Sequence, residues 1–293
     1  MKKTLAIILT FVMLFSFASC GKKTEPTEVI KGVGKADIKV ENAEGVLAEV
    51  LKKGVLTIGT SPDFAPSEYI DMETNELKGC EMVLAQYVAN TLGVQLVVEQ
   101  MDFSGVLTAV DTGKVDIGIS GFGWKKDRAE LYELTHGYTG TSEASHHTIL
   151  VRTEDKDKYN SLADFDGVHI NAQAGSLQQM YVEDQLPNAN LELVTTIDQS
   201  ILNLQTGKVD AVALARTSAT QYANTSDGMF YSMLDKNIEF DLSMYDDYSG
   251  NVMACKKGET SMVEVLNQII ADVTEKNLYT EWYDAAKKDA GIE

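Results

Sequence analysis

The chain has 293 residues, of which 44% are hydrophobic, so it is long enough to bury substantial cores in two domains. Its 44 Asp and Glu against 25 Lys and Arg give a formal net charge of −19. This argues against a nucleic-acid partner, because nucleic-acid binding needs a basic face that neutralises phosphates. It also argues against adhesion of the folded body to an anionic membrane, and the main effect expected of the charge is solubility.

The N-terminus has the pattern of a targeting segment. Two lysines precede an apolar run that is too short to span a bilayer and that ends in small residues before Cys20. A cysteine in this position resembles that of a bacterial lipobox, where it is lipidated and becomes the new N-terminus; plain secretion and a transmembrane anchor are the alternatives. We expect residues 1–19 to be a signal peptide. The polar, non-periodic residues 20–43 are expected to be a lipid-anchored flexible tether.

Strand and helix patterns alternate in the first half of the folded part. Apolar runs of strand length are followed by stretches with apolar residues at helical spacing, and Gly93 is placed to cap the first of these helices. The order strand, helix, strand, helix, strand is typical of a parallel sheet covered by helices. The predicted elements are a strand at 56–60, a helix within 76–93, a strand at 94–101, a helix at 103–113 and a strand at 115–120.

The second half repeats this order and then departs from it. The repeat again predicts a parallel sheet with helices, and the C-terminal pattern predicts a short strand and two amphipathic helices. These elements are strands at 168–173, 191–196, 209–214 and within 251–258, and helices within 174–185, 198–207 and 261–291.

The pentapeptide TGKVD occurs twice, at residues 112–116 and 206–210. Each copy ends a predicted helix, supplies a glycine cap and begins a predicted strand. Ligands of open α/β sheets bind beyond the carboxyl ends of the strands. We interpret the two copies as equivalent joints of two similar lobes, although cap and strand chemistry alone could also produce them.

The chain can cross between lobes near residues 146–152 and near residues 248–255. We therefore predict an α/β protein with two lobes, each a mixed, mostly parallel sheet flanked by helices, joined by a two-strand hinge. Such a hinge allows a cleft to close on a small molecule. The predicted boundaries are residues 44–147 and 251–293 for lobe 1 and residues 148–250 for lobe 2.

Two cysteines lie beyond Cys20, at positions 80 and 255. Their spacing does not decide whether they pair. We favour two separate, half-buried thiols, with a disulfide as the alternative. No Cys/His cluster suggests a metal, and we expect no metal and no cofactor.

Five motifs occur in order along residues 45–290. They are GVLTIGTSPDFAPSEY, LKGCEMVLAQYVANTLG, MDFSGVLTAVDTGKVDIGISG, KKDRAELYELTHGY and EKNLYTEWYDAA. In this order they resemble the bacterial extracellular solute-binding proteins of family 3, which serve ABC importers of polar amino acids. The resemblance implies a periplasmic-binding-protein fold of type 2.

The resemblance assigns roles to three side chains. Phe64 and Phe103 fall where the family places aromatic rings against the ligand, and the alternative for each is an ordinary core phenylalanine. Arg128 falls at the arginine that grips the ligand carboxylate, for which a guanidinium fork is suited; its alternative is a surface ion pair. Backbone N–H groups are implied at Gly121 in lobe 1 and, in lobe 2, at Gln173, Ala174, Gly175, Ser176 and Leu177.

Two positions depart from the family pattern. Gly123 stands where the family usually has the Ser or Thr that bonds the ligand ammonium, and Ala215 stands where it usually has the Asp that balances the ammonium charge. Because an unpaired buried cation costs several kcal/mol, about that much binding energy would be lost by a standard α-amino acid. We therefore expect a carboxylate ligand that is not a standard α-amino acid held in the usual way.

Neighbouring residues could replace the lost groups. Phe122 and Trp124 lie beside Gly123, where Trp124 could contact a diffuse cation or ring or could fill the lobe interface. Arg216 could add a positive group for a dicarboxylate. A relocated acid for an ammonium could come from Asp63, Glu68, Asp246 or Asp247.

The leading functional hypothesis is a receptor held by its lipid at the extracellular face of the cell membrane, periplasmic where there is an outer membrane. Its expected partners are a small-molecule carboxylate and ABC permease subunits, and we expect a monomer that contacts the membrane only through the anchor. No enzyme activity is expected, because no catalytic arrangement stands out and the histidine pair at 146 and 147 near the hinge suggests a structural or solvent role. The alternatives are an enzyme resembling cyclohexadienyl dehydratase and a sensor acting with a separate receptor.

Overall fold

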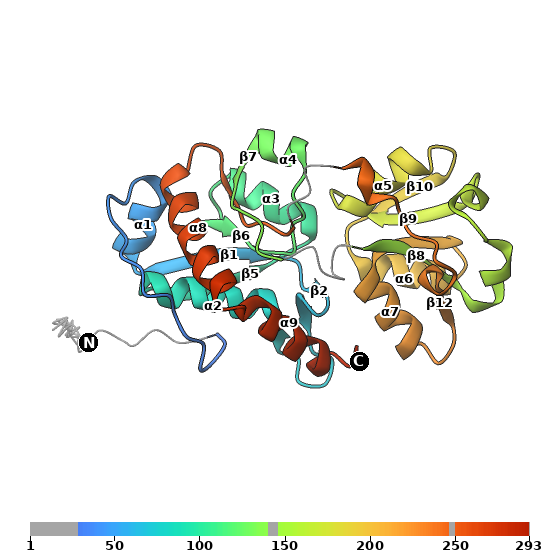
Figure 1. The fold of residues 1–293 in the computed structure, drawn as a ribbon, viewed down its shortest axis with the longest axis horizontal. Helices are drawn as coiled ribbons and strands as arrows, with labels where there is room; N and C mark the ends of the chain where they lie inside the picture. Colours follow the sequence, from blue (N-terminus) through green and yellow to red (C-terminus); the bar gives the residue numbers. More distant parts are fainter. Residues whose placement is uncertain (1–28, 140–145, 246–249, 293) are drawn as a thin grey trace, which may run out of the picture.

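The computed structural model describes residues 29–139, 146–245 and 250–292, which form two lobes (Figure 1). Within this part of the chain, no helix is both long and apolar enough to cross a membrane. Cys20 and residues 1–28, for which a signal peptide, lipidation and the start of a tether are predicted, lie outside the described residues.

Each lobe is built around a five-stranded sheet. In the spatial order of both sheets, the first three strands are parallel to one another. The fourth strand pairs antiparallel with the third, and the fifth pairs antiparallel with the fourth. The predicted two-lobed fold with mixed sheets is therefore confirmed. The lobe 1 order is β5 (Gln95–Gln100), β1 (Val55–Thr60), β6 (Ile117–Gly118), β13 (Ala254–Lys256) and β7 (Tyr132–Leu134). The lobe 2 order is β10 (Asn190–Val194), β9 (His169–Gln173), β11 (Ala211–Ala215), β8 (His147–Arg152) and β12 (Phe230–Ser232).

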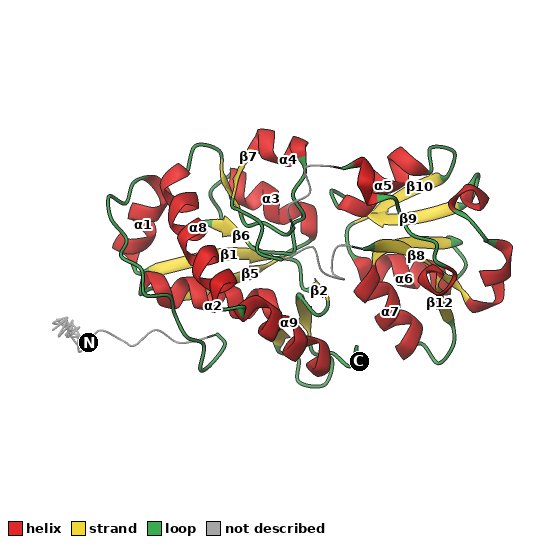
Figure 2. Ribbon diagram, viewed as in Figure 1, coloured by secondary structure: helices red, strands yellow, loops and turns green. Residues whose placement is uncertain are grey.

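Helices cover the sheets, and a small third sheet lies beside the cleft (Figure 2). Lobe 1 carries α1 (Gly45–Lys53), α2 (Cys80–Leu92), α3 (Phe103–Asp111), α4 (Lys126–Leu131), α8 (Thr260–Glu275) and α9 (Leu278–Asp289). Lobe 2 carries α5 (Leu177–Gln185), α6 (Ile197–Gln205) and α7 (Arg216–Thr225). The small sheet is β2 (Asp63–Phe64), β3 (Glu68–Ile70) and β4 (Leu77–Lys78), and neither it nor α1 was predicted.

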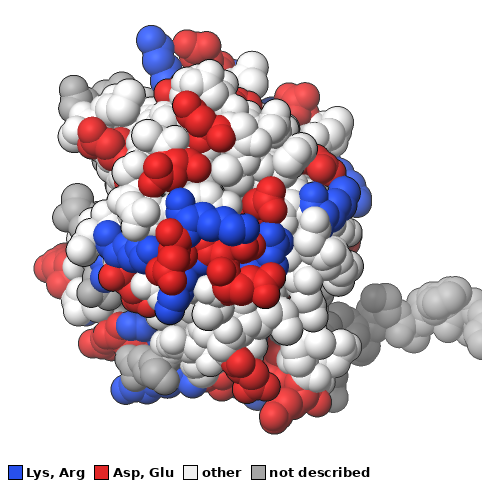
Figure 3. Space-filling view, turned by 90° about the vertical axis from the view of Figure 1, so that its right-hand side faces the viewer, with Lys and Arg blue, Asp and Glu red and all other residues white. Residues whose placement is uncertain are grey.

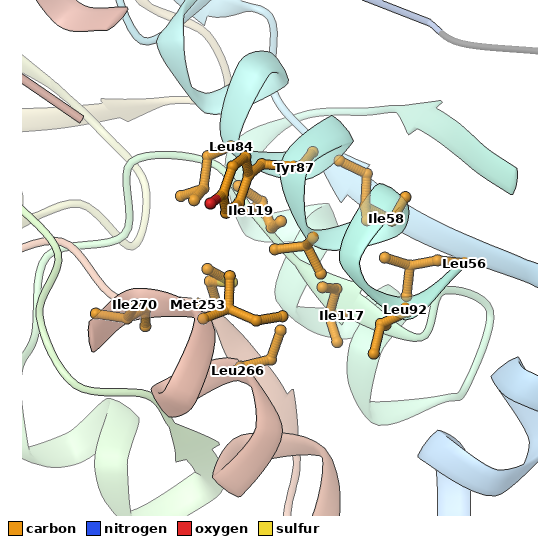
Figure 4. Packing of buried hydrophobic residues seen from close by; sticks show 14 of the residues in the cluster. Leu56, Ile58, Leu84, Tyr87, Leu92, Ile117, Ile119, Met253, Leu266 and Ile270 are labelled. Carbon is orange, nitrogen blue, oxygen red and sulfur yellow. The ribbon is translucent and has the colours of Figure 1, made fainter. Parts of the chain in front are cut away.

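The lobe 1 core lies between the sheet and the helices α2 and α8 (Figure 4). Burying each large aliphatic side chain contributes about 1.5–3 kcal/mol, so this core holds segments together that are far apart in the sequence. Its labelled members are Leu56, Ile58, Leu84, Tyr87, Leu92, Ile117, Ile119, Met253, Leu266 and Ile270.

The two TGKVD copies occupy equivalent joints, as predicted. Gly113 and Gly207 follow helices α3 and α6 with φ of 70° and 73°, a conformation that glycine adopts without strain. In each copy the lysine N–H donates back to the last turn of the helix, from Lys114 to Ala109 and from Lys208 to Asn203. The chain then enters β6 in lobe 1 and β11 in lobe 2, so each joint directs a strand end toward the cleft.

Residues 29–43 pack along α2 and do not form the free tether predicted for residues 20–43. The N–H of Val29 donates to Gln86 Oε1 at 2.7 Å, and the N–H of Ala36 donates to Thr91 Oγ1 at 2.9 Å. Apolar side chains at 30, 33, 38 and 40 contact the lobe 1 core. These scattered apolar residues gain by burial against α2, although their spacing matches neither helix nor strand.

Cys80 and Cys255 are free thiols, and both are fully buried, not half-buried as predicted. Burial raises the pKa of both thiols above the usual range. They therefore contribute to the core as small hydrophobic side chains.

Figure 3 views the end of lobe 2, where basic and acidic side chains are interspersed. Arg152 and Lys158 both pair with Asp155, at 2.8 and 2.6 Å, and Lys208 pairs with Glu192 at 2.6 Å. The Lys208–Glu192 pair is exposed on both sides and contributes little stability, whereas Asp155 is buried between its two basic partners.

Candidate functional site

A cleft lies between the lobes, with about 710 Å³ of empty space that includes solvent at its mouth. Lobe 1 supplies Phe64, Ser67, Phe103, Gly121, Gly123, Arg128, Thr139, Asn251, Tyr279 and Tyr283. Lobe 2 supplies His147, Gln173, Ser176, Leu177, Gln178, Ile197 and Thr217.

Arg128 is the only charged side chain among the described residues of this wall. It lies on α4 and is 2% exposed. Its Nη1 donates to the carbonyl of Gly123, and its Nη2 donates across the cleft to the carbonyl of Gly175 at 2.8 Å. Its guanidinium carbon lies 5.1 Å from the centroid of Phe122 and 5.8 Å from that of Phe103, so two rings support the cation.

The Arg128 guanidinium has no acidic partner among the described residues, and its Nε has no hydrogen-bond partner there. The neighbouring Asp127 instead pairs with Lys125 at 3.0 Å. Burial lowers the pKa of Arg128 to about 10, so the group stays positive at neutral pH. A buried cation with an unused donor is expensive unless an anion arrives, and a carboxylate fits its planar fork.

The two predicted aromatic residues both line the cleft, in different ways. Phe64 lies on β2, and its ring is 3.0 Å from where a Cβ on Gly121 would be. Gly121 has φ of 54°, so both its conformation and this close approach favour glycine. Phe103 begins α3 and packs on Phe122, with ring centroids 4.8 Å apart. Its ring also makes a cation–π contact with Arg128.

The lobe 2 loop lines the cleft, but most of its amides are already used. Gly175 N–H donates to Gln179 Oε1 at 2.7 Å, and Ser176 N–H donates to the Gln173 carbonyl at 3.2 Å. The N–H of Ala174 donates to the carbonyl of Val194. The prediction that these N–H groups are free for a ligand is therefore wrong for Ala174, Gly175 and Ser176.

Five predicted site residues lie outside the cleft wall, and one of them, Gly175, still accepts from Arg128 through its carbonyl. Phe122 is fully buried, with Arg128 over its ring. Trp124 packs against the lobe 1 hydrophobic cluster to which Phe122 belongs. Ala215 ends β11 and is 2% exposed. Arg216 begins α7 and lines a separate pocket with Thr217, Thr220, Tyr283, Lys287 and Ile292.

Of the suggested replacement acids that the structure describes, Asp63 is engaged through both oxygens and Glu68 through one, because Glu68 Oε2 has no hydrogen-bond partner there. Glu68 is fully buried, and its Oε1 accepts from Ser120 at 2.9 Å. Burial and the nearby Glu81 carboxyl raise its pKa well above the usual range, so it is held protonated. Asp246 and Asp247 lie outside the described residues.

Asp63 connects the two lobes. Its Oδ2 accepts from the Ile197 N–H at 2.7 Å, at the start of α6, and from Gln173 Nε2 at 2.9 Å. Its Oδ1 accepts from Ser61 at 2.8 Å within lobe 1. A lobe 1 carboxylate at the N-terminus of a lobe 2 helix favours the closed arrangement through charge and hydrogen bonding.

We expect Asp63→Asn to weaken ligand affinity about tenfold, since charged hydrogen bonds contribute about 1.5–3 kcal/mol and the amide retains one acceptor. Small-angle scattering should show a more open average shape. Ser61→Ala, which removes only the bond within lobe 1, should have a smaller effect on both measurements. Unchanged affinity and scattering in Asp63→Asn would contradict a closing role.

His147 is the main cleft residue that sequence reasoning assigned elsewhere. It begins β8, one residue earlier than the predicted start of lobe 2, and it is 5% exposed. Its Nδ1 lies 2.9 Å from Gln178 Nε2 and its ring packs on Tyr181. The sequence places it beside the predicted hinge, but only the fold shows that it lines the cleft.

Other wall residues come from distant segments. Helix α9 contributes Tyr279 and Tyr283, which lie one turn apart. A second pair is Thr139 and Asn251, joined by a 2.7 Å hydrogen bond from the Asn251 N–H to Thr139 Oγ1. The four-residue spacing of the tyrosines was the one local signal for them. The described residues contain no group of three or more His, Cys, Asp or Glu placed for a metal ion.

The chain matches the bacterial extracellular solute-binding proteins, family 3, over residues 56–285. It therefore belongs to this family, as the motifs predicted.

Three similar proteins illustrate the match. The L-cystine-binding protein TcyA of Bacillus subtilis (strain 168) is 25% identical over 94% of this chain and 93% of the relative. An amino acid ABC transporter substrate-binding protein from Streptococcus pneumoniae Canada MDR_19A, solved with L-arginine, has a TM-score of 0.74 and 28% identity, over 84% of this chain and 98% of that one. An ancestral amino acid-binding protein, a precursor of cyclohexadienyl dehydratase, has a TM-score of 0.70 and 23% identity over 82% and 99%.

Proposed function

We propose that this protein is the extracellular, lipid-anchored receptor of an amino-acid-type ABC importer, and that its lobes close on a carboxylate held by Arg128. The observation that carries the proposal is a buried, positively charged guanidinium with an unused Nε–H and no acidic partner among the described residues. Burying such a cation costs free energy that two carbonyls and two rings offset in part, and a bound anion would offset the rest, which favours an occupied site.

The relatives support an amino acid or an amino-acid derivative as the ligand. TcyA is named for L-cystine, and the Streptococcus pneumoniae protein was solved with L-arginine. Both ligands carry a carboxylate, which the proposed role of Arg128 requires. Contacts between the lobes, from Arg128 to Gly175 and from Asp63 to Ile197, support closure as the step that encloses the ligand.

A thermal-shift and calorimetry screen tests the proposal. The panel contains amino acids, their N-methyl and N-acetyl derivatives, aromatic carboxylates and dicarboxylates. A true ligand at 100 times its dissociation constant should add about 2.7 kcal/mol of stability. Uncharged esters or amides of the same compounds should not bind, and if they bind as tightly as the acids, a carboxylate grip is wrong.

The enzyme alternative is tested in the same samples. Incubation with prephenate and arogenate should give no product, and turnover would replace the receptor proposal with a dehydratase. For the anchor, an alkyne-labelled fatty acid should be incorporated into the wild-type protein and not into Cys20→Ala, which should be released from the membrane.

A further inference from the structure

His147 lines the cleft and carries a buried polar atom without a hydrogen-bond partner among the described residues. Its side chain is 5% exposed, and its unpartnered atom is Nε2. Its other ring nitrogen, Nδ1, lies 2.9 Å from Gln178 Nε2. With the Gln178 amide placed so that its nitrogen faces Nδ1, Nδ1 is the acceptor and the ring proton is assigned to Nε2. The unpartnered ring nitrogen of this cleft-lining residue is therefore a hydrogen-bond donor.

The His147 ring stays neutral while it does this. Burial, with a smaller effect from His146, lowers its pKa to about 3. Packing against Tyr181, with ring centroids 4.9 Å apart, and the bond to Gln178 fix the ring orientation. The buried Nε2–H costs free energy unless an acceptor meets it, which is the condition of a binding donor.

The register of the lobe 2 sheet links this donor to one of the departures from the family. His147 on β8 lies directly opposite Ala215 on β11 in the antiparallel ladder. Directly opposite residues point to the same face of a sheet, so the methyl group of Ala215 and the ring of His147 are neighbours. At the position where the resemblance places an ammonium-binding Asp, this chain has a methyl group beside an N–H donor.

The charges of the other cleft-lining residues also favour an acceptor over an ammonium in the ligand. Among the described residues of the wall there is one cation, Arg128, and there is no aspartate or glutamate. Asp63 is engaged across the lobes, and Glu68 is not among the lining residues: its Oε1 accepts from Ser120, and its Oε2 has no partner among the described residues. A free ammonium next to His147 would place donor against donor, whereas a carbonyl oxygen would satisfy the Nε2–H.

We propose that the ligand carries, next to the carboxylate held by Arg128, an uncharged carbonyl oxygen that accepts from His147, as in N-acylated amino acids and 2-oxo acids. His147 is then the residue that selects against a free ammonium, and Gln178 is the residue that positions its tautomer. This inference rests on the proposed function and narrows its ligand class.

The test is calorimetry on the full mature chain at pH 7 with matched compounds. The probes are L-arginine, Nα-acetyl-L-arginine and 5-guanidino-2-oxopentanoate, together with L-cystine and N,N′-diacetyl-L-cystine. We expect at least one carbonyl form to bind tenfold or more tighter than its free amino acid. The acetyl and 2-oxo arms show which of the two sources of the carbonyl is preferred.

Variants separate selection from folding. His147→Phe keeps a ring against Tyr181 and should bring the ratio of affinities, carbonyl form over free amino acid, close to one. His147→Gln keeps an N–H donor and should retain part of this preference. Gln178→Leu should reduce the preference, and ¹⁵N NMR should show the Nε2–H tautomer in wild type. The matched control is His169→Phe, at an exposed position, which should change nothing.

The outcomes distinguish the two proposals. If a free amino acid binds tightest and its binding is lost in Arg128→Met, this inference is wrong and the proposed function stands. The inference is also wrong if the carbonyl preference persists in a folded His147→Phe protein. If no probe binds at millimolar concentration, or binding does not depend on Arg128, the proposed function fails together with it.

Discussion

Arg128→Met should lower ligand affinity by at least about 100-fold, because two charge-assisted hydrogen bonds contribute about 1.5–3 kcal/mol each. The same change should leave the ligand-free protein equally stable or more stable. The wild-type cation is 2% exposed and has no acidic partner among the described residues, and replacing a buried charge by an apolar side chain is often neutral or stabilising. Calorimetry measures the first effect, and urea unfolding without ligand measures the second.

Arg128→Lys is the conservative variant. It keeps the charge but loses the planar fork, as well as the bonds to the carbonyls of Gly123 and Gly175. We expect an intermediate loss of about tenfold to 100-fold in affinity. A large loss of stability in Arg128→Met, together with weakened binding of every compound including uncharged ones, would identify Arg128 as structural and would overturn its role as the carboxylate grip.

The fold could be predicted where its signals are local. Helix α2 ends as its sequence indicates, because Gly93 adopts φ of 70° and closes the last turn. The strand predicted at 115–120 is shorter, and β6 covers only Ile117–Gly118. The chain turns at Gly121 with φ of 54° beside the cleft, where the ring of Phe64, from a distant segment, leaves no room for a Cβ.

The site could be predicted only in part, for the same reason. Arg128 was identified because its motif is contiguous, and it does face the cleft. Trp124 lies beside Gly123 in sequence, but the bridge from Gly123 to Asn251 and the bond from its own N–H to Gly250 direct the chain so that its ring packs on lobe 1. Such pairings join residues more than 120 positions apart, and no local pattern encodes them.

The contribution of His147 could not be predicted from sequence, because it depends on three elements meeting. Its donor character comes from Gln178 on α5, its significance comes from the register with Ala215 on β11, and its burial comes from Tyr181. Each of these contacts is a product of the lobe 2 sheet and its helix. A histidine next to a crossing segment carries no such information by itself.

A buried carboxyl next to the cleft should make stability depend on pH. Glu81 on α2 is fully buried and accepts from Tyr138 Oη and Tyr279 Oη, both at 2.8 Å. Burial, partly offset by these bonds, raises its pKa to about 7 from the usual 4.5. Between these two pH values the unfolded chain loses the proton and the folded protein keeps it, so the folded state binds more protons there.

Stability is therefore highest below about pH 4.5 with respect to this group and is lost as the pH rises to about 7, by about 3 kcal/mol in the free energy of unfolding. Depressed aspartate pKa values act at lower pH, but the lowered pKa of His147 makes stability rise with pH up to about 6.5 and opposes this effect, so the Glu81 contribution is taken from the difference between wild type and Glu81→Gln. Glu81→Gln cannot ionise and should lose most of this slope, while the buried Glu68, whose pKa is also raised, should leave a remainder. Urea unfolding of both proteins at pH 4.5, 6 and 7.5 measures the difference. Parallel pH profiles would show that Glu81 is ionised in the folded protein, and its two tyrosine bonds would then outweigh the cost of burying its charge.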